Sequence, residues 1–374
     1  MAIVLSWVST FRAQFKLSKI YDRYGQVVTQ WDASLPPFLP DNEYVSKDRY
    51  DAVRMNLISQ QKRKSGLDAD NGKAISWALV TGASRGIGRA IAISLARRRI
   101  PVVLVARDKS RLQQLSSTIK HCYGVQTLVI ESDLSNSDAV TKICEALDEQ
   151  NIDVGILVNN AGAGDTREVV AMSGSIIDQL CLLNIVNTTK LTQLLGAKMK
   201  VKGRGRIAFM SSVTGAVAGV PSAAVYAATK SYQRSFAASL GRELEDYGVG
   251  VSCIIPGAVA ETTFASSANM ADATVWQFPI GRLTPEIVAE STVRTIIRGR
   301  QEVVVGWVNA LLIHVVGYIA PSRLVMLIAE FSWKPPPFHT KSKQKNKGER
   351  SLGISISQIT MFTITKTVIF SFAH

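Results

Sequence analysis

Cysteine is scarce in this chain: four residues among 374, standing far apart at Cys122, Cys144, Cys181 and Cys253. This spacing excludes a disulfide framework and a Cys-x-x-Cys metal site, and it favours a reducing compartment. The 26 glycines and 12 prolines show no three-residue period, which excludes a collagen-like chain. Hydrophobic residues make up 47% of the sequence, too many for a disordered protein, so we expect a globular fold with a sizeable core.

Acidic residues are also few, because 29 aspartates and glutamates face 43 lysines and arginines, a formal net charge of +14. Much of the surplus lies in residues 331–374, where Glu349 stands among seven basic residues. No RNA-binding aromatic pattern or recognition helix accompanies this charge, so the sequence predicts no nucleic-acid partner. An anionic membrane surface is compatible with it.

The first residues of the chain lack acids altogether until Asp22, and large apolar side chains repeat there every four positions, at Ile3, Trp7, Phe11 and Phe15. This pattern indicates a basic amphipathic helix in the segment 1–30. Its apolar run is far shorter than the roughly 20 residues of a membrane-spanning helix. Such a helix lies on a membrane surface, addresses an organelle, or packs on the protein's own core. We expect peripheral association with the endoplasmic reticulum or another internal membrane, with a plastid or mitochondrion as the alternative.

The middle of the chain has the pattern of an α/β domain. Residues 31–72 are irregular and indicate a linker or embellishment, whereas from 73 to 306 short apolar runs alternate with helix-length segments. Continuously apolar runs such as Val102–Val105 are typical of parallel strands buried on both faces. We expect a Rossmann-type doubly wound parallel seven-stranded sheet with helices on both faces. Its strands are predicted at Ile75–Thr81, Val102–Ala106, Gln126–Ser132, Val154–Asn159, Arg206–Ser211, Gly250–Ile255 and Glu302–Gly306.

A long uncharged stretch, Val303–Ser322, follows this domain, but glycines and polar residues interrupt it, so we predict no transmembrane helix. Its first residues complete the seventh strand, and Pro321 ends the rest as a helix. A second short helix is indicated by the helical spacing of Leu324, Leu327, Ile328 and Phe331. This C-terminal extension, residues 307–333, fits membrane docking, a wall of the substrate pocket or a homodimer interface. Residues 334–374 are expected to form a basic flexible tail.

A glycine-rich turn at residues 81–88 follows the first predicted strand and opens the helix expected at Arg89–Arg99. The first glycine permits the tight turn, the second lets the backbone approach a pyrophosphate, and the third allows helix and strand to pack closely. The helix N-terminus then holds the phosphates. We therefore expect this turn to bind a dinucleotide through Gly82, Ser84, Arg85, Gly86, Ile87 and Gly88.

The end of the second strand predicts which dinucleotide binds. An acid there would hold the ribose 2′-hydroxyl of NAD, but the position carries Ala106 followed by Arg107. Without a carboxylate to repel a 2′-phosphate, and with guanidinium groups at Arg107 and Arg85, NADP(H) is favoured. Asp108 is expected to cap the next helix, as Thr284, followed by Pro285 and Glu286, is expected to cap a later one.

Tyr226 and Lys230 lie four residues apart on a predicted helix, so they share one face. A phenol with a pKa of about 10 is a poor acid–base catalyst at neutral pH, and a nearby ammonium brings it into range. The pair is therefore a candidate for acid–base chemistry.

The glycine-rich turn, Asn159-Asn160-Ala161-Gly162 after the fourth strand, Ser211-Ser212 after the fifth, and Tyr226-x-x-x-Lys230 together resemble the motifs of the short-chain dehydrogenase/reductase family. The resemblance covers residues 73–306 and implies an NAD(P)-dependent oxidoreductase. Residues Trp307–Phe331 look like the helical extension of relatives that reduce long-chain lipid or steroid ketones at membranes.

This resemblance implies a role for each matching residue. Tyr226 would be the general acid that protonates the substrate carbonyl, while Lys230 would lower the pKa of the tyrosine and bind the nicotinamide ribose. Ser212 would position the carbonyl, with Ser211 the weaker candidate, and Asn184 would hold a water-linked proton relay. The other implied cofactor contacts are Asp133 and Leu134 near the adenine, Asn160, Ala161 and Gly162 on the far side of the cofactor, and Pro256, Gly257 and Thr262 near the carboxamide.

Two loops depart from the family's usual spacing. Ser212 stands 14 residues before Tyr226, one more than in close relatives, and the stretch from Pro256 to Thr262 is also one residue longer. Insertions in loops at strand ends are well tolerated, so both assignments are kept.

We therefore predict an NADPH-dependent reductase that converts the carbonyl of a hydrophobic substrate, of 3-ketoacyl, ketosphingoid or steroid type, to a secondary alcohol. The alternatives are a catalytically inactive NADP-binding scaffold and an NAD-dependent alcohol dehydrogenase. No metal site is predicted. The stretch Glu261–Arg282 lies where related enzymes have a mobile lid, and its apolar residues, Trp276 among them, are expected to close over an apolar chain.

Overall fold

The computed structural model describes residues 76–217, 219–260, 262, 264–268, 283–311, 313–314 and 321–333. The expected N-terminal segments 1–30 and 31–72, most of the expected lid and the tail 334–374 lie outside the described residues.

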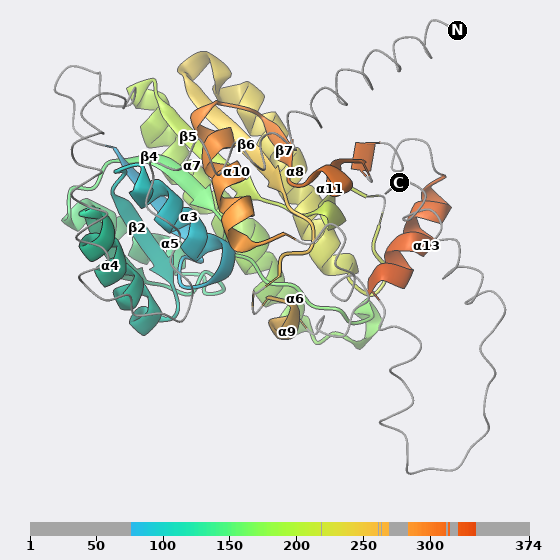
Figure 1. Ribbon diagram of the computed structural model, residues 1–374. Coiled ribbons are helices and arrows are strands. Elements are labelled where there is room, and N and C mark those ends of the chain that lie inside the picture. The colour runs from blue at the N-terminus through green and yellow to red at the C-terminus, as the bar shows by residue number, and fades with distance from the viewer. Residues whose placement is uncertain are drawn as a thin grey trace, which may run out of the picture.

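Seven parallel strands form one sheet in the order β3-β2-β1-β4-β5-β6-β7 (Figure 1). The chain builds the sheet outward from β1 in one direction, returns to place β4 on the other side of β1, and continues outward. This confirms the predicted doubly wound topology, whose ligand-binding crevice lies at the carboxyl ends of the strands beside β1 and β4. The strands are β1 (Trp77–Thr81), β2 (Val102–Ala106), β3 (Thr127–Glu131), β4 (Val154–Asn159), β5 (Gly205–Met210), β6 (Val249–Ile255) and β7 (Glu302–Val304).

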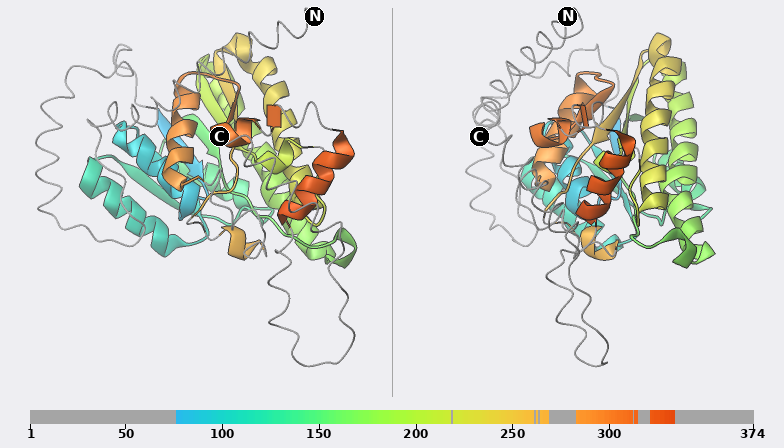
Figure 2. Two further views of the ribbon diagram at one scale, coloured as in Figure 1. Left: turned by 45° about the vertical axis from the view of Figure 1, so that its right-hand side comes forward. Right: turned by 90° about the vertical axis from the view of Figure 1, so that its right-hand side faces the viewer.

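Helices cover both faces of the sheet, and the right-hand view of Figure 2 shows the two helical layers on opposite sides. One layer contains α3 (Gly86–Arg97), α4 (Lys109–Tyr123) and α10 (Pro285–Ile297). The other contains α5 (Ala139–Glu149), α7 (Asn187–Lys202) and α8 (Ala224–Leu244). The other elements of the described chain are η1 (Val169–Ala171), α6 (Gly174–Cys181), η2 (Leu182–Val186), η3 (Val213–Gly215), η4 (Glu245–Tyr247), α9 (Phe264–Ser267), α11 (Trp307–Leu311) and α13 (Ser322–Trp333).

Each central strand has apolar residues on both faces because both faces are covered. In β1, Ala78 and Val80 pack in the layer of α3 and α10, whereas Leu79 faces the layer of α5 and α7. All three side chains are fully buried. This burial explains why the strands are continuously apolar in the sequence.

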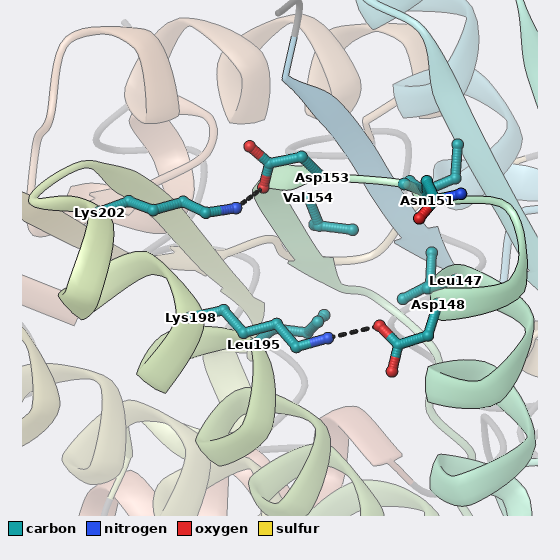
Figure 3. A pocket seen from close by; sticks show the side chains of 9 residues that line it. Leu147, Asp148, Asn151, Asp153, Val154, Leu195, Lys198 and Lys202 are labelled. Carbon is teal, nitrogen blue, oxygen red and sulfur yellow. Dashed lines mark hydrogen bonds and ion pairs between the residues drawn. The ribbon is translucent and has the colours of Figure 1, made fainter.

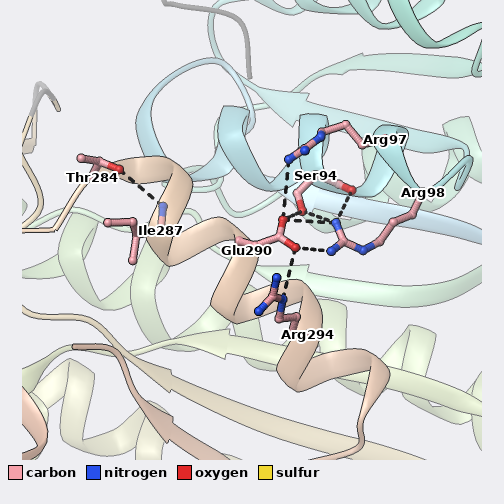
Figure 4. Close-up of polar contacts among 7 residues, drawn as sticks. All are labelled: Ser94, Arg97, Arg98, Thr284, Ile287, Glu290 and Arg294. Carbon is pink, nitrogen blue, oxygen red and sulfur yellow. Dashed lines mark hydrogen bonds and ion pairs between the residues drawn. The ribbon is translucent and has the colours of Figure 1, made fainter. Parts of the chain in front are cut away.

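Polar caps set the starts of two helices as predicted. The Asp108 carboxylate accepts the backbone N–H of Arg111 at 3.1 Å and begins α4. The Thr284 hydroxyl accepts the N–H of Ile287 at 3.4 Å, and Pro285 occupies the first turn of α10 (Figure 4). Each cap satisfies a backbone donor that the helix leaves unpaired.

A buried carboxylate joins α10 to α3, the helix that begins at the glycine-rich turn. Glu290 accepts the Ser94 hydroxyl at 2.9 Å and is bonded by Arg98, while Arg294 lies 3.4 Å away on α10 (Figure 4). Burial alone would raise the pKa of Glu290, but these partners hold it below its usual value. The cluster therefore fixes α3 against α10 through a charged carboxylate.

The C-terminal extension contains the second helix predicted after Pro321, α13. Val325, Ala329 and Trp333 face the protein, whereas Leu324 and Leu327 are exposed. The spacing of apolar residues alone could not distinguish these two sides, because both carry apolar side chains. Among the helices in the described ranges, none has the length and apolar character needed to cross a membrane.

Candidate active site

The glycine-rich turn has the backbone geometry that the sequence predicts. Gly82 and Gly86 adopt positive φ angles of +67° and +52°, which favour glycine. A Cβ atom on Gly88 would lie 2.2 Å from the carbonyl oxygen of Gly82, so only glycine lets α3 pack this closely on the turn. Ser84 and Ile87 are half-buried in the same turn, and Arg85 is exposed.

Hydrogen bonds from Asn160 connect the end of β4 to the start of the glycine-rich turn. Its side-chain amide donates to the carbonyl of Thr81 at 2.8 Å, and the backbone N–H groups of Asn160 and Ala161 both donate to the Thr81 hydroxyl at 3.0 Å. The Asn160 amide is therefore engaged with the protein backbone. The backbone of residues 160–162 remains the part of this motif that can line a cofactor.

The side chains expected near the adenosine lie at the carboxyl ends of β2 and β3. Arg107 is 73% exposed and lies 3.7 Å from Asp133, and Arg85 lies 3.9 Å from Asp108. Asp133 also accepts the N–H and the hydroxyl of Ser135, at 2.9 and 2.7 Å. Two guanidinium groups thus lie where the 2′-phosphate of NADP(H) is expected, and each has a carboxylate beside it.

Leu134, next to Asp133, is buried, and its carbonyl accepts the side-chain amide of Asn187 at 2.8 Å. This bond ties the segment after β3 to α7.

Tyr226 lies on α8 and is only 5% exposed. Burial raises its pKa to about 12, and the hydroxyls of Ser212 and Thr214 beside it hold the value lower than burial alone would. We expected Lys230 to lower the pKa of Tyr226. Its ammonium instead lies 5.8 Å from the centre of the tyrosine ring and bonds to Met210 and Gln233. At neutral pH the phenol is therefore protonated and able to donate.

Lys230 is buried one helical turn after Tyr226. Its ammonium donates to the carbonyl of Met210 at 2.8 Å and to the side chain of Gln233 at 2.9 Å. Burial lowers the pKa of Lys230 to about 8, so it is still largely charged at neutral pH. A Cβ atom on Gly162 would lie 3.1 Å from the Lys230 Nζ, so this glycine lets the β4 loop approach the ammonium.

Asn184 lies in η2, a wide π-helical turn between α6 and α7. Its side chain donates to the carbonyl of Ala163 at 2.8 Å and to the hydroxyl of Thr229 at 2.9 Å, and it accepts the N–H of Ala163 at 3.0 Å. π-Helical turns widen the backbone and are frequent at functional sites. The turn thus joins the β4 loop to α8 in the immediate surroundings of Tyr226 and Lys230.

The two serines after β5 point to different partners. The Ser211 hydroxyl donates to the carbonyl of Lys230 at 2.8 Å, a bond within the fold. Ser212 begins η3 and lies beside Tyr226, as the resemblance implies. Thr214 also borders Tyr226 and is 2% exposed.

The loop after β6 reaches the other motifs despite its extra residue. The Pro256 carbonyl accepts the N–H of Val213 at 3.0 Å, and the Thr262 hydroxyl donates to the carbonyl of Val259 at 3.2 Å. A Cβ on Gly86 would lie 3.2 Å from the Thr262 methyl, which places Thr262 against the glycine-rich turn. Gly257 packs against Asn309, where a Cβ would lie 2.5 Å from the asparagine side chain.

Aromatic side chains from two later elements cover Tyr226. Phe264 of α9 and Trp333 of α13 have ring centres 5.7 and 6.5 Å from that of Tyr226. Trp333 also packs against Val220, Ala223 and Ala227. The surroundings of the phenol are therefore apolar and aromatic on one side and hydroxyl-lined on the other.

Three polar residues of this site were not predicted from the sequence: Thr214, Thr229 and Gln233. Thr229 and Gln233 follow Tyr226 by three and seven positions, so helical spacing could have placed them on the same face of α8. Thr214 carries no such signal, because its position depends on how η3 folds against α8.

A hollow lies at the opposite, amino-terminal end of the sheet, between α5 and α7 (Figure 3). Its four charged side chains form two ion pairs, Lys198 with Asp148 at 2.7 Å and Lys202 with Asp153. The paired charges and the distance from the sequence motifs leave the carboxyl-terminal crevice as the candidate active site.

Comparisons with known proteins agree with this geometry. A family model described as short chain dehydrogenase matches residues 76–273. A very-long-chain 3-oxoacyl-CoA reductase from Macaca fascicularis is 31% identical over 277 residues, which cover 72% of this chain and 83% of that protein.

Among solved structures, a short-chain dehydrogenase from Sphingobium yanoikuyae in complex with NADPH is similar, with a TM-score of 0.58, 28% identity and coverage of 63% of this chain and 90% of that one. A 3-oxoacyl-[acyl-carrier protein] reductase from Brucella melitensis with bound NAD has a TM-score of 0.54, 27% identity and coverage of 62% and 89%. The fold, the order of the motifs and the match over more than half its length show that the chain belongs to the short-chain dehydrogenase family of oxidoreductases.

Proposed function

We propose that this chain is an NADPH-dependent reductase that converts the 3-keto group of a long-chain acyl thioester to a secondary alcohol. The observation that carries the proposal is the buried, protonated phenol of Tyr226, with hydroxyls beside it and Lys230 one turn away, at the crevice where the glycine-rich turn lies. A protonated donor in a site with little water is what ketone reduction requires of the protein.

The residues of the crevice fit a dinucleotide. At the start of α3, within the described residues, no side chain caps the first turn and no acid stands in it, so its N–H groups and positive end suit a pyrophosphate. Gly86 and Gly162 leave room where side chains would meet Thr262 and Lys230. When bound, the reduced nicotinamide supplies the hydride that adds to the carbonyl carbon.

Each side chain around the carbonyl then has a separate task. Tyr226 donates its proton to the carbonyl oxygen, which becomes the hydroxyl of the product. Ser212 orients that oxygen by a hydrogen bond, and the Lys230 ammonium favours the phenolate that remains on Tyr226. Asn184 holds η2 against the β4 loop and α8, which keeps the site in register.

Arg107 and Arg85 support NADPH over NADH. The Arg107 side chain is 73% exposed and lies 3.7 Å from Asp133, so it can turn toward a 2′-phosphate, and the Arg85 side chain is 46% exposed. The phosphate, with charge-assisted hydrogen bonds from two guanidinium groups, is a stronger partner than these exposed ion pairs.

The relative's name and the cover over Tyr226 support a long-chain thioester as substrate. The relative from Macaca fascicularis is named for 3-oxoacyl-CoA substrates with very long chains. Phe264 and Trp333 offer an apolar surface next to the reacting position, where an acyl chain loses no hydrogen bonds on burial.

A substrate panel tests this proposal. The purified full-length chain is mixed with NADPH and, separately, with short- and long-chain 3-oxoacyl-CoA, a 3-ketosphingoid base and a steroid ketone. We expect the highest kcat/KM with the long-chain 3-oxoacyl-CoA. Faster turnover of the steroid or the sphingoid base would contradict the substrate class, and no NADPH oxidation with any ketone would favour an inactive scaffold.

We further propose that the protein binds peripherally to the endoplasmic reticulum or another internal membrane. Trp307, Leu324 and Leu327 of the C-terminal extension are exposed, and both ends of the sequence are basic. The full chain should float with anionic vesicles in a density gradient and fail to float with neutral ones. Equal recovery at the bottom of the gradient in both cases would contradict peripheral binding.

A further inference from the structure

Gln233 connects two of the candidate catalytic residues, Lys230 and Asn184. It lies on α8 three positions after Lys230 and is 1% exposed. Its Oε1 accepts the Lys230 ammonium at 2.9 Å, and its Nε2 donates to the backbone carbonyl of Asn184 at 2.9 Å. Both ends of this buried amide are thus bonded to the site.

The Asn184 carbonyl that Gln233 bonds lies in the wide turn of η2. A buried carbonyl without a donor costs free energy, and a π-helical turn interrupts the regular pattern of backbone hydrogen bonds. The Asn184 side chain is occupied by Ala163 and Thr229. The Gln233 amide therefore donates to the backbone carbonyl of Asn184, while the Asn184 side chain holds the β4 loop through Ala163.

The three N–H groups of the Lys230 ammonium can be assigned in turn. One donates to the carbonyl of Met210 at 2.8 Å and a second to Gln233. The third is left for the nicotinamide ribose, the partner that the family resemblance gives to this lysine. Two fixed acceptors thus hold the direction of the third donor.

We propose that Gln233 is a positioning residue that holds the Lys230 ammonium in place and links it directly to the Asn184 carbonyl. In the relay that the resemblance implies, a water molecule takes part in the link from Asn184. Here an amide makes that link, and Lys230 is held as a fixed positive charge. The hydrogen bond between Gln233 and Lys230 is present whatever the substrate is. Its effect on turnover rests on the proposed function.

Within the part of the chain that the structure describes, two ionisable groups lie near Lys230. Tyr226 lies on its own helix, and Cys253 of β6 is the neighbour that acts on its charge. Burial raises the pKa of the Cys253 thiol to about 12, so it is neutral in the working range. With the pKa of Lys230 at about 8, loss of one acceptor has a measurable effect on its titration.

Titration of Lys230 in the full-length, cofactor-free protein tests the proposal by NMR of labelled lysine side chains. In Gln233→Met, which has a similar volume and no acceptor, we expect the acid dissociation constant of Lys230 to rise about tenfold. In Gln233→Glu we expect it to fall, because a carboxylate stabilises the ammonium. Thr292→Val, which removes a buried hydroxyl bonded to Val288 on α10, is the control and should leave the titration unchanged.

Unchanged titration in both Gln233 variants would overturn the proposal. If Gln233→Met does not fold, Gln233→Glu, which keeps the volume and an acceptor, decides alone: a fall in the dissociation constant supports the contact and no change refutes it. The dissociation constant for NADPH, measured by fluorescence, should rise several-fold in Gln233→Met and stay constant in Thr292→Val. A wild-type protein without ketone reduction would sink the proposed function, but the titration would still decide the role of Gln233.

Discussion

Tyr226 has its acid–base properties set by the side chains that it touches. Burial keeps the phenol protonated, the hydroxyls of Ser212 and Thr214 border it, and Lys230 stands one turn away as a separate cation. The spacing of Tyr226 and Lys230 predicted their shared helix face. Helical spacing could also have placed Gln233 beside the ammonium, whereas the Met210 carbonyl could not be predicted, because it reaches Lys230 only when β5 packs against α8.

Replacing Tyr226 by phenylalanine should abolish reduction while leaving the fold intact. The ring and its contacts with Phe264 and Trp333 remain, but the proton donor is lost. We expect kcat to fall by at least about a hundredfold with an unchanged dissociation constant for NADPH. A variant with most of its turnover would show that another group donates the proton.

Lys230 predicts the alkaline limb of the pH profile. Its pKa of about 8 means that the ammonium is lost as the pH rises through that value, so kcat/KM for NADPH, which reports the free enzyme, should decline above about pH 8. Unfolding through this lysine would not explain the decline, because a lysine pKa lowered from 10.5 makes the folded state more stable as the pH rises from 8 to 10.5. A profile that stays flat to pH 9.5 would contradict the assignment.

Arg107 should determine the preference between the two cofactors. Arg107→Ala removes a guanidinium partner of the 2′-phosphate, so NADPH affinity should fall about tenfold or more while NADH affinity changes little. Lys109→Ala is the matched control, since Lys109 is an exposed cation near Arg107 that pairs with Glu131. Equal losses for both cofactors, or an equal effect of Lys109→Ala, would contradict the role of Arg107.

At the scale of elements, the strands and the capped helices followed from local signals, and the arrangement of the extension did not. The apolar runs and the caps at Asp108 and Thr284 depend on neighbours along the chain, so the sequence predicted them closely. Which side of α13 is buried depends on its contact with Val220 and Ala227, residues about a hundred positions away. A pattern with apolar residues on both sides cannot reveal such a contact.

The joint between α3 and α10 should depend on Glu290. Glu290→Gln leaves three guanidinium groups without their carboxylate, so the free energy of unfolding should fall by about 3 kcal/mol at pH 7. Denaturant unfolding measures this loss. Asp148→Asn, which breaks the exposed pair with Lys198, should cost less than about 1 kcal/mol.

The same carboxylate predicts the response to acid. The folded pKa of Glu290 lies below its ordinary value of 4.5, so its contribution is complete above pH 4.5 and is lost as the pH falls through the folded value. The difference in stability between wild type and Glu290→Gln should therefore shrink on acidification below pH 4.5. A difference that is constant from pH 7 to pH 3 would contradict a charged Glu290.

At the scale of the whole molecule, the doubly wound topology explains why distant motifs form one site. The ends of β1, β2, β4, β5 and β6 meet at one edge of the sheet, so the glycine-rich turn and the loops that carry Gly162, Ser212 and Thr262 come together there. Helix α8 adds Tyr226 and Lys230 to the same crevice. Motif order along the chain was therefore enough to predict that these segments lie together, whereas the aromatic cover from α9 and α13 required the tertiary structure.

The most direct test of the central claim follows the hydride itself. The purified wild-type chain is incubated with a long-chain 3-oxoacyl-CoA and NADPH carrying deuterium at the transferable position of the nicotinamide, and the product is analysed by mass spectrometry. We predict a 3-hydroxyacyl-CoA with one deuterium on carbon 3 and one NADP⁺ formed for each product molecule, and no product from the Tyr226→Phe variant. Unreduced substrate after incubation with the wild-type protein, or a product without deuterium on carbon 3, would contradict the account.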